Sequence, residues 1–158
     1  MTARWCLRCG EVDTGVRSLV IGYGNDLRSD DGAGRVVADR IGELDLPGVE
    51  VRSVAQLTPE LALEITKFDI VVFVDANVEV SQTTCAPVVA ATAQPSAMTH
   101  FSSPESLLGM TASLGPVPPR AFTISIPVTD LGLGLELTPM TEIGVAQAVD
   151  MVTSLLDR

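Results

Sequence analysis

Residues 22–34 read GYGNDLRSDDGAG, and they follow the apolar run Ser18-Leu19-Val20-Ile21. A β-branched run that stops at Gly-x-Gly predicts a buried strand that ends in a tight turn, with a helix beginning near residues 32–34. The neighbouring acids Asp30 and Asp31 are therefore expected at the carboxyl edge of a strand. Open α/β sheets build their sites at that edge, so we interpret the two carboxylates as a sign of chemistry rather than of solubility.

The rest of the chain alternates strand and helix signals. Residues 68–74 form its most apolar run, which predicts a central strand covered by helices on both faces. Three Ser/Thr-Pro pairs predict helix starts, with the hydroxyl residue as N-cap: Thr58-Pro59, Ser103-Pro104 and Thr138-Pro139. We expect strands at 17–21, 49–54, 68–74, 85–91 and 121–126, and helices at 34–44, 58–67, from 103 onward and 138–156. This alternation predicts an α/β fold with a largely parallel sheet and helices on both faces.

Length and charge limit the possible functions. The 158 residues fit one domain, and we expect a loose N-terminal tail over 1–16 and a single α/β domain over 17–158. The net charge of −10 disfavours nucleic acid and anionic membrane surfaces as partners. Apolar runs such as Ile70 to Val74 are far shorter than the roughly 20 residues of a membrane helix. No signal-peptide pattern opens the sequence, so we expect a cytoplasmic protein.

The three cysteines do not define a framework. An odd number implies no closed set of disulfides. Cys6-x-x-Cys9 has the spacing of half a zinc ribbon, but Cys85 alone cannot supply the second pair of ligands. We therefore place Cys6 and Cys9 in the tail, with a redox pair as the alternative.

The glycine-rich segment does not fit a dinucleotide site. Gly-x-Gly-x-x-Gly requires a third glycine where this chain has Leu27, and the acids Asp30 and Asp31 would repel a pyrophosphate. One of the two carboxylates is expected to cap the following helix. We expect Asp30 to support the turn and Asp31 to project into the crevice.

Two further residues complete a candidate metal site. Asp75 ends the most apolar predicted strand, and His100, the only histidine, precedes a helix start. Taken alone, Asp75 also fits a turn role with Asn77, and His100 also fits an ordinary surface position. Together with Asp31 they offer oxygen and nitrogen ligands from three separate loops, a set that suits a divalent ion such as nickel or zinc.

The order of these motifs resembles that of the hydrogenase maturation endopeptidases. The matching stretches are Gly22-x-Gly24-Asn25-x-Leu27-x-x-Asp30-Asp31-Gly32-x-Gly34, then Val74-Asp75-Ala76, and then His100 ahead of Ser103-Pro104 and Leu107-Leu108. The match runs from about Ser18 to Leu156. Many members have glutamate where this chain has Asp31.

The resemblance implies a three-layer α/β/α sandwich around a five-stranded sheet. It also implies an aspartic-type, nickel-dependent reaction, in which a C-terminal peptide is removed from the large-subunit precursor of a nickel-iron hydrogenase. The metal-facing and catalytic positions of that family correspond to Asp31, Asp75 and His100. The nickel is supplied by the substrate, no organic cofactor is implied, and we expect a monomer.

Two other functions remain open from the sequence. A non-catalytic chaperone or metal-sensing module could keep the same metal-facing residues without turnover. A small-molecule-binding α/β domain could instead use the turn at Gly22.

Overall fold

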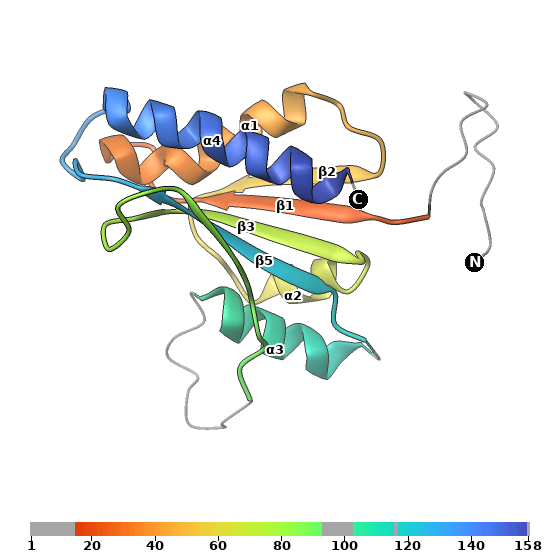
Figure 1. Ribbon diagram of the computed structural model, residues 1–158. Helices are drawn as coiled ribbons and strands as arrows, with labels where there is room; N and C mark the ends of the chain where they lie inside the picture. The colour runs from red at the N-terminus through yellow and green to blue at the C-terminus, as the bar shows by residue number, and fades with distance from the viewer. Residues whose placement is uncertain (1–14, 93–102, 116, 158) are drawn as a thin grey trace.

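The computed structural model describes residues 15–92, 103–115 and 117–157. Within these ranges the chain forms a five-stranded sheet, four α-helices and one short 3-10 turn (Figure 1). The strands are β1 (Ser18–Tyr23), β2 (Val49–Val54), β3 (Ile70–Asn77), β4 (Thr84–Pro87) and β5 (Arg120–Pro127). The helices are α1 (Ala33–Glu43), α2 (Glu60–Ile65), α3 (Pro104–Leu114) and α4 (Pro139–Leu156), and the 3-10 turn η1 (Ser29–Gly32) precedes α1.

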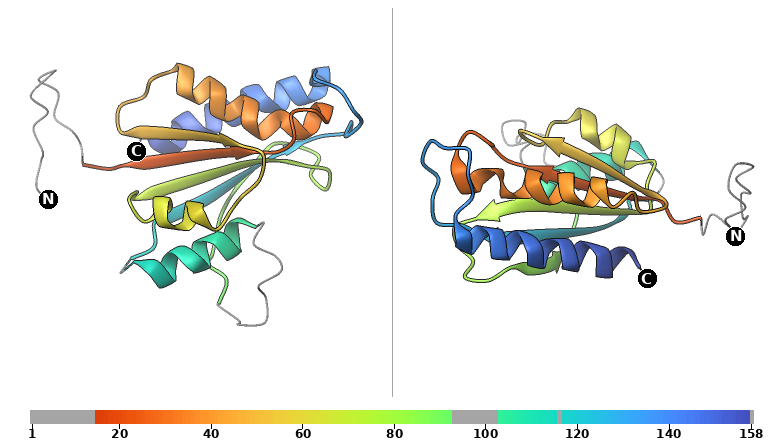
Figure 2. Two further views of the ribbon diagram at one scale, coloured as in Figure 1. Left: turned by 180° about the vertical axis from the view of Figure 1, so that it is seen from behind. Right: turned by 90° about the horizontal axis from the view of Figure 1, so that it is seen from above.

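The sheet has the strand order β2-β1-β3-β5-β4. All pairs are parallel except β4, which runs antiparallel to β5 at one edge. Helices α1 and α4 cover one face, and α2 and α3 cover the other (Figures 1 and 2). The predicted three-layer fold with a largely parallel sheet is thus confirmed.

The hydrophobic core lies in two layers, one on each face of the sheet. Strand β3 contributes to both, because its residues from Val71 to Val74 are completely buried. Leu19, Ile21 and Phe73 pack toward α2 and α3, whereas Val20, Val72 and Val74 pack toward α1 and α4. A strand that is apolar on both faces takes the central position, as the sequence predicted.

The glycines of the opening motif let α1 lie directly on the sheet. A Cβ at Gly22 would overlap the carbonyl oxygen of Gly34, and a Cβ at Gly34 would overlap that of Val74. Gly24 has φ +142°, a conformation that favours glycine. Close packing of helix and strand therefore explains these glycines without a bound nucleotide.

The expected element boundaries shift by up to four residues, and the largest corrections are in β4 and β3. The strand expected at 85–91 is β4, which ends at Pro87; proline has no N–H to continue a ladder and is confined to edge strands. The central strand extends past Asp75 to Asn77. Asp75 is therefore paired with β5 inside the strand and does not end it.

The predicted helix starts are right in position, and two of the three caps form. The Oγ of Ser103 accepts a hydrogen bond from the N–H of Ser106, and the Oγ1 of Thr138 accepts one from the N–H of Thr141. Thr58 does not act as a side-chain cap, because α2 begins after Pro59 without one.

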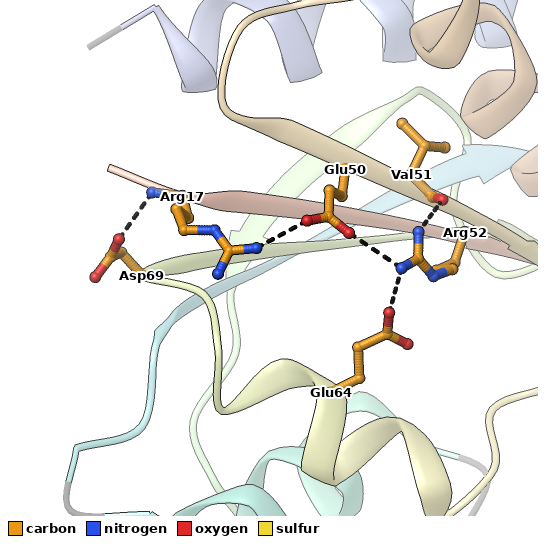
Figure 3. A network of polar contacts seen from close by, with 6 residues as sticks. All are labelled: Arg17, Glu50, Val51, Arg52, Glu64 and Asp69. Atoms are coloured by element: carbon orange, nitrogen blue, oxygen red, sulfur yellow. Dashed lines mark hydrogen bonds and ion pairs between the residues drawn. The ribbon is translucent and has the colours of Figure 1, made fainter. Parts of the chain in front are cut away.

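A chain of charged side chains covers the edge strand β2 (Figure 3). Arg17 binds Glu50 at 2.8 Å, and Arg52 on the same strand contacts both Glu50 and Glu64 of α2. The backbone N–H of Arg17 also donates to Asp69 at 2.8 Å. Charged residues along an edge discourage pairing with another chain.

None of the helices in the described ranges is long and apolar enough to span a membrane. Cys85 on β4 is exposed and free. Cys6, Cys9 and His100 lie outside the described residues.

Candidate functional site

The candidate site lies at the carboxyl edge of the parallel strands, where β1 leads into η1 and β3 ends. Asp31 belongs to η1 and Asp75 to β3. Strands β1 and β3 are neighbours with Gly22 opposite Val74. This pairing carries the two aspartates, 44 positions apart in the sequence, to one edge of the sheet.

Asp75 belongs to a row of polar side chains that crosses the sheet on the face covered by α2 and α3. The register that pairs Gly22 with Val74 places Tyr23 beside Asp75, and β5 places Ser125 on the other side of it. Because side chains alternate along a strand, Asp75 shares its face with Val71 and Phe73. This polar row therefore borders the apolar core under α2 and α3, at the carboxyl end of the strands.

The environment of Asp75 raises its pKa to about 6. Burial is the main cause, and the negative charge of Asp31 adds to it. Hydrogen bonds from the Tyr23 hydroxyl and the Ala76 backbone act in the opposite direction and stabilise the ionised form. Asp75 is thus an acid held in a desolvated place within electrostatic reach of a second carboxylate.

Tyr23 shares this environment. Burial and then the negative charge of Asp75 raise the pKa of the Tyr23 phenol, and Glu105 in the first turn of α3 contributes less. The phenol therefore stays protonated and donates to Asp75. Tyr23, Ser125 and Glu105 were missed by sequence reasoning. Tyr23 sits inside the quoted motif, but its contact with Asp75 depends on the register of β1 and β3.

Asp31 is partly exposed and held by its own loop. One of its carboxylate oxygens accepts a hydrogen bond from the backbone N–H of Asn25 at 3.0 Å. The side chain of Asn25 in turn accepts from the N–H of Leu27 at 3.0 Å. These local bonds fix the loop from which Asp31 reaches the edge of the sheet.

Asp30 is a structural anchor, as the sequence led us to expect, but it is not a helix cap. It is completely buried, and its carboxylate accepts hydrogen bonds from the backbone N–H groups of Thr129, Asp130 and Thr138. The hydroxyl of Thr138 donates to it as well, at 3.0 Å. No side chain caps α1, which begins after Gly32. The prediction that one of the two carboxylates caps this helix is therefore wrong. The side chain of Asp30 instead binds the loop before α4.

The structure brings together two of the three expected metal-facing residues, Asp31 and Asp75. The third, His100, lies in the segment between β4 and α3 that is outside the described residues. Within the described ranges, no three His, Cys, Asp or Glu side chains form a group able to hold a metal ion. The three-residue site therefore stays a prediction.

Comparison with known proteins gives a consistent result at the level of structure. No protein-family model matches the sequence, and no curated protein matches it. The fold is similar to that of the [NiFe] hydrogenase maturation protease HycI from Thermococcus kodakarensis, with a TM-score of 0.72 and 23% identity over 92% of this chain and 96% of that one.

Two further structures agree. The hydrogenase 2 maturation peptidase from a Thaumarchaeota archaeon has a TM-score of 0.67 and 27% identity, over 89% of this chain and 97% of that one. The hydrogenase maturating endopeptidase HybD from E. coli has a TM-score of 0.69 and 21% identity, over 90% of this chain and 93% of that one. The likeness extends over about nine tenths or more of each chain. The structural comparison supports the resemblance drawn from the glycine-rich motif: the chain has the fold of the hydrogenase maturation proteases.

Proposed function

We propose that this protein is an endopeptidase that removes a C-terminal peptide from the large-subunit precursor of a [NiFe] hydrogenase after nickel has been inserted. The observation that carries the proposal is the pair Asp31 and Asp75, which share the carboxyl edge of a sheet whose fold is that of hydrogenase maturation proteases. In this proposal the protein works in the cytoplasm, and its nickel belongs to the substrate.

The electrostatics of the pair favour a cation as the missing partner. The negative charge of Asp31 disfavours the ionised form of Asp75 and contributes to the raised pKa of Asp75. A divalent ion between them would reverse the interaction and favour both ionised forms. With a pKa of about 6, Asp75 is largely ionised at neutral pH even before a metal arrives. His100 would supply the nitrogen ligand expected from the sequence.

In this proposal Asp31 and Asp75 have different roles. Asp31, on a loop at the rim, would contact the substrate's nickel first, and Asp75, held by Tyr23, would complete the oxygen ligands. A carboxylate next to a bound carbonyl could also accept a proton from an attacking water. The metal's contribution would be to polarise the scissile carbonyl or to activate that water.

The proposal is tested by incubating the purified protein with nickel-loaded large-subunit precursor and measuring the intact mass of the precursor. We expect it to become shorter by one discrete C-terminal peptide. Stable binding of the loaded precursor without any shortening would contradict the proposal and would favour the chaperone interpretation.

Variants then test the site. Asp31→Asn, Asp75→Asn and His100→Ala should each abolish shortening and keep a cooperative thermal unfolding transition. A matched control is Asp39→Asn, an exposed aspartate on α1, which should process the precursor at the wild-type rate. Full activity in any of the three site variants would remove that residue from the site.

A further inference from the structure

Three exposed leucines lie on two loops that border the candidate site. Leu27 is 59% exposed, Leu133 92% and Leu135 78%. Leu27 precedes Asp31 by four residues in one loop, and the other two lie in the loop between β5 and α4. We call Leu27, Leu133 and Leu135 the leucine surface.

The two loops are joined along their backbones. The N–H of Gly134 donates to the carbonyl of Leu27 at 3.0 Å, and the N–H of Ser29 donates to the carbonyl of Gly134 at 2.9 Å. As a result Gly134, which separates Leu133 from Leu135, pairs as a short parallel bridge with Arg28. This backbone bridge therefore brings the segment of Leu27 next to the segment of Leu133 and Leu135.

Side chains hold this arrangement rigidly. The guanidinium of Arg28 donates to the carbonyl of Leu131 at 3.1 Å, and the hydroxyl of Ser29 donates to that of Gly132 at 3.1 Å. The buried carboxylate of Asp30 fastens both ends of the second loop, at Thr129 and Thr138. A partner that binds here would meet ordered loops and would lose little of its affinity to ordering them. A fixed apolar surface exposed to water is typical of an interaction site.

The charges on the two loops indicate the chemistry of the partner. Asp26, Asp31, Asp130 and Glu136 lie on them, against the single cation of Arg28. Asp26 is compensated by Arg35 of α1 at 3.0 Å. Since the whole chain carries −10, the field over this edge attracts positive charge. The surface thus fits a partner that presents apolar side chains flanked by lysine or arginine.

We propose that the leucine surface docks the hydrogenase large-subunit precursor through an apolar patch flanked by basic residues. This inference rests on the proposed function, because it takes the partner to be the substrate. Its support is position: Leu27 and Asp31 share one loop, so a protein that brings a metal to Asp31 lies over the leucines as well.

The test compares two double variants, each of which replaces two exposed apolar side chains by serine. Leu133→Ser with Leu135→Ser alters the leucine surface, and Leu63→Ser with Val89→Ser alters exposed residues of α2 and of the segment after β4. The probe is nickel-loaded precursor from the same organism. Its dissociation constant is measured by surface plasmon resonance, and its KM and kcat by intact mass.

We expect the first double variant to raise the dissociation constant and KM on the order of tenfold with kcat nearly unchanged. The control variant should match the wild type. Raising the salt from about 0.05 to 0.5 M should weaken wild-type binding several-fold, because screening reduces attraction between opposite charges.

The two proposals fail in different ways. Wild-type protein that binds the precursor and leaves its mass unchanged contradicts the proposed protease, and the docking proposal is then decided by binding alone. Equal dissociation constants for wild type and the leucine variant, or no binding of the precursor, overturn the docking proposal. A wild-type dimer that the leucine variant converts to a monomer also overturns it, because the occupant is then a second copy of this chain.

Discussion

Replacing Asp75 by asparagine is expected to make the protein more stable at alkaline pH while it abolishes processing. In the folded protein the pKa of Asp75 is raised from 3.8 to about 6, so the folded state binds this proton more tightly than the unfolded state does. The stabilisation by the protonated carboxyl is complete below about pH 4 and is lost as the pH rises through about 6. Asparagine is neutral at every pH and avoids this loss.

The size of the effect follows from the pKa and from the position of the side chain. The difference between 3.8 and about 6 corresponds to roughly 3 kcal/mol. Asp75 is only partly buried, so water screens some of this cost, and we expect a gain of about 1–2 kcal/mol for Asp75→Asn at pH 8. For a chain of this size, that gain raises the melting temperature by roughly 3–6 °C.

The assay is denaturant unfolding of both proteins at several values between about pH 4 and 8, across the interval set by the two pKa values. We expect the two stability curves to be close together at the acid end and to separate steadily between about pH 4 and 6.5. Asp39→Asn, on the exposed face of α1, controls for the change in net charge and should follow the wild type. A constant difference between Asp75→Asn and wild type at all pH values would refute the reasoning.

Three other substitutions test the loop anchor, the packing of α1 on the sheet and the hydrogen bond to Asp75. Asp30→Asn should lower the free energy of unfolding by about 2–4 kcal/mol at pH 7, because the amide cannot accept from all the N–H groups around it. Burial raises the pKa of Asp30, but backbone hydrogen bonds lower it more. The loss measured by urea unfolding should therefore shrink as the pH falls below about 4. Gly34→Ala should lower the free energy of unfolding by about 1–3 kcal/mol, because its Cβ collides with strand carbonyls. Gly42→Ala in the same helix should raise it by about 0.5–1 kcal/mol. Thermal unfolding compares the two variants, and equal melting temperatures would contradict the close-packing explanation. Tyr23→Phe should raise the pKa of Asp75 further, because the lost hydrogen bond favours the ionised form; carbon NMR titration of the carboxyl measures it, and an unchanged value would remove the hydrogen bond from the account.

The fold was predictable from the sequence because its strongest signals are local. The apolar run through Val74 has no place except the middle of a covered sheet, and the Ser103-Pro104 and Thr138-Pro139 pairs start helices whatever lies around them. Strand β4 was harder. Pro87 is a local sign of an edge strand that ends early, and the prediction of 85–91 did not use it. Nothing local in the segment shows that it pairs antiparallel with β5.

The candidate site was predictable only in part, because its chemistry depends on register. Asp31 and Asp75 could be named from their places at strand ends, but the contact of Tyr23 with Asp75 arises from the alignment of two strands distant in sequence. The prediction of a capping carboxylate was wrong because the partners of Asp30 are also distant in sequence. A carboxylate before a helix usually caps it, yet here the partners lie about 100 residues further along the chain.

The most direct measurement is a comparison of two precursors that differ only in nickel. Nickel-loaded and nickel-free large-subunit precursor are incubated with the same protein, and the intact mass of each is followed over time. We expect the loaded precursor to lose its C-terminal peptide and the nickel-free precursor to keep its full mass. Equal shortening of both would contradict recognition of the substrate's nickel by Asp31, Asp75 and His100, and shortening of neither would contradict the peptidase itself.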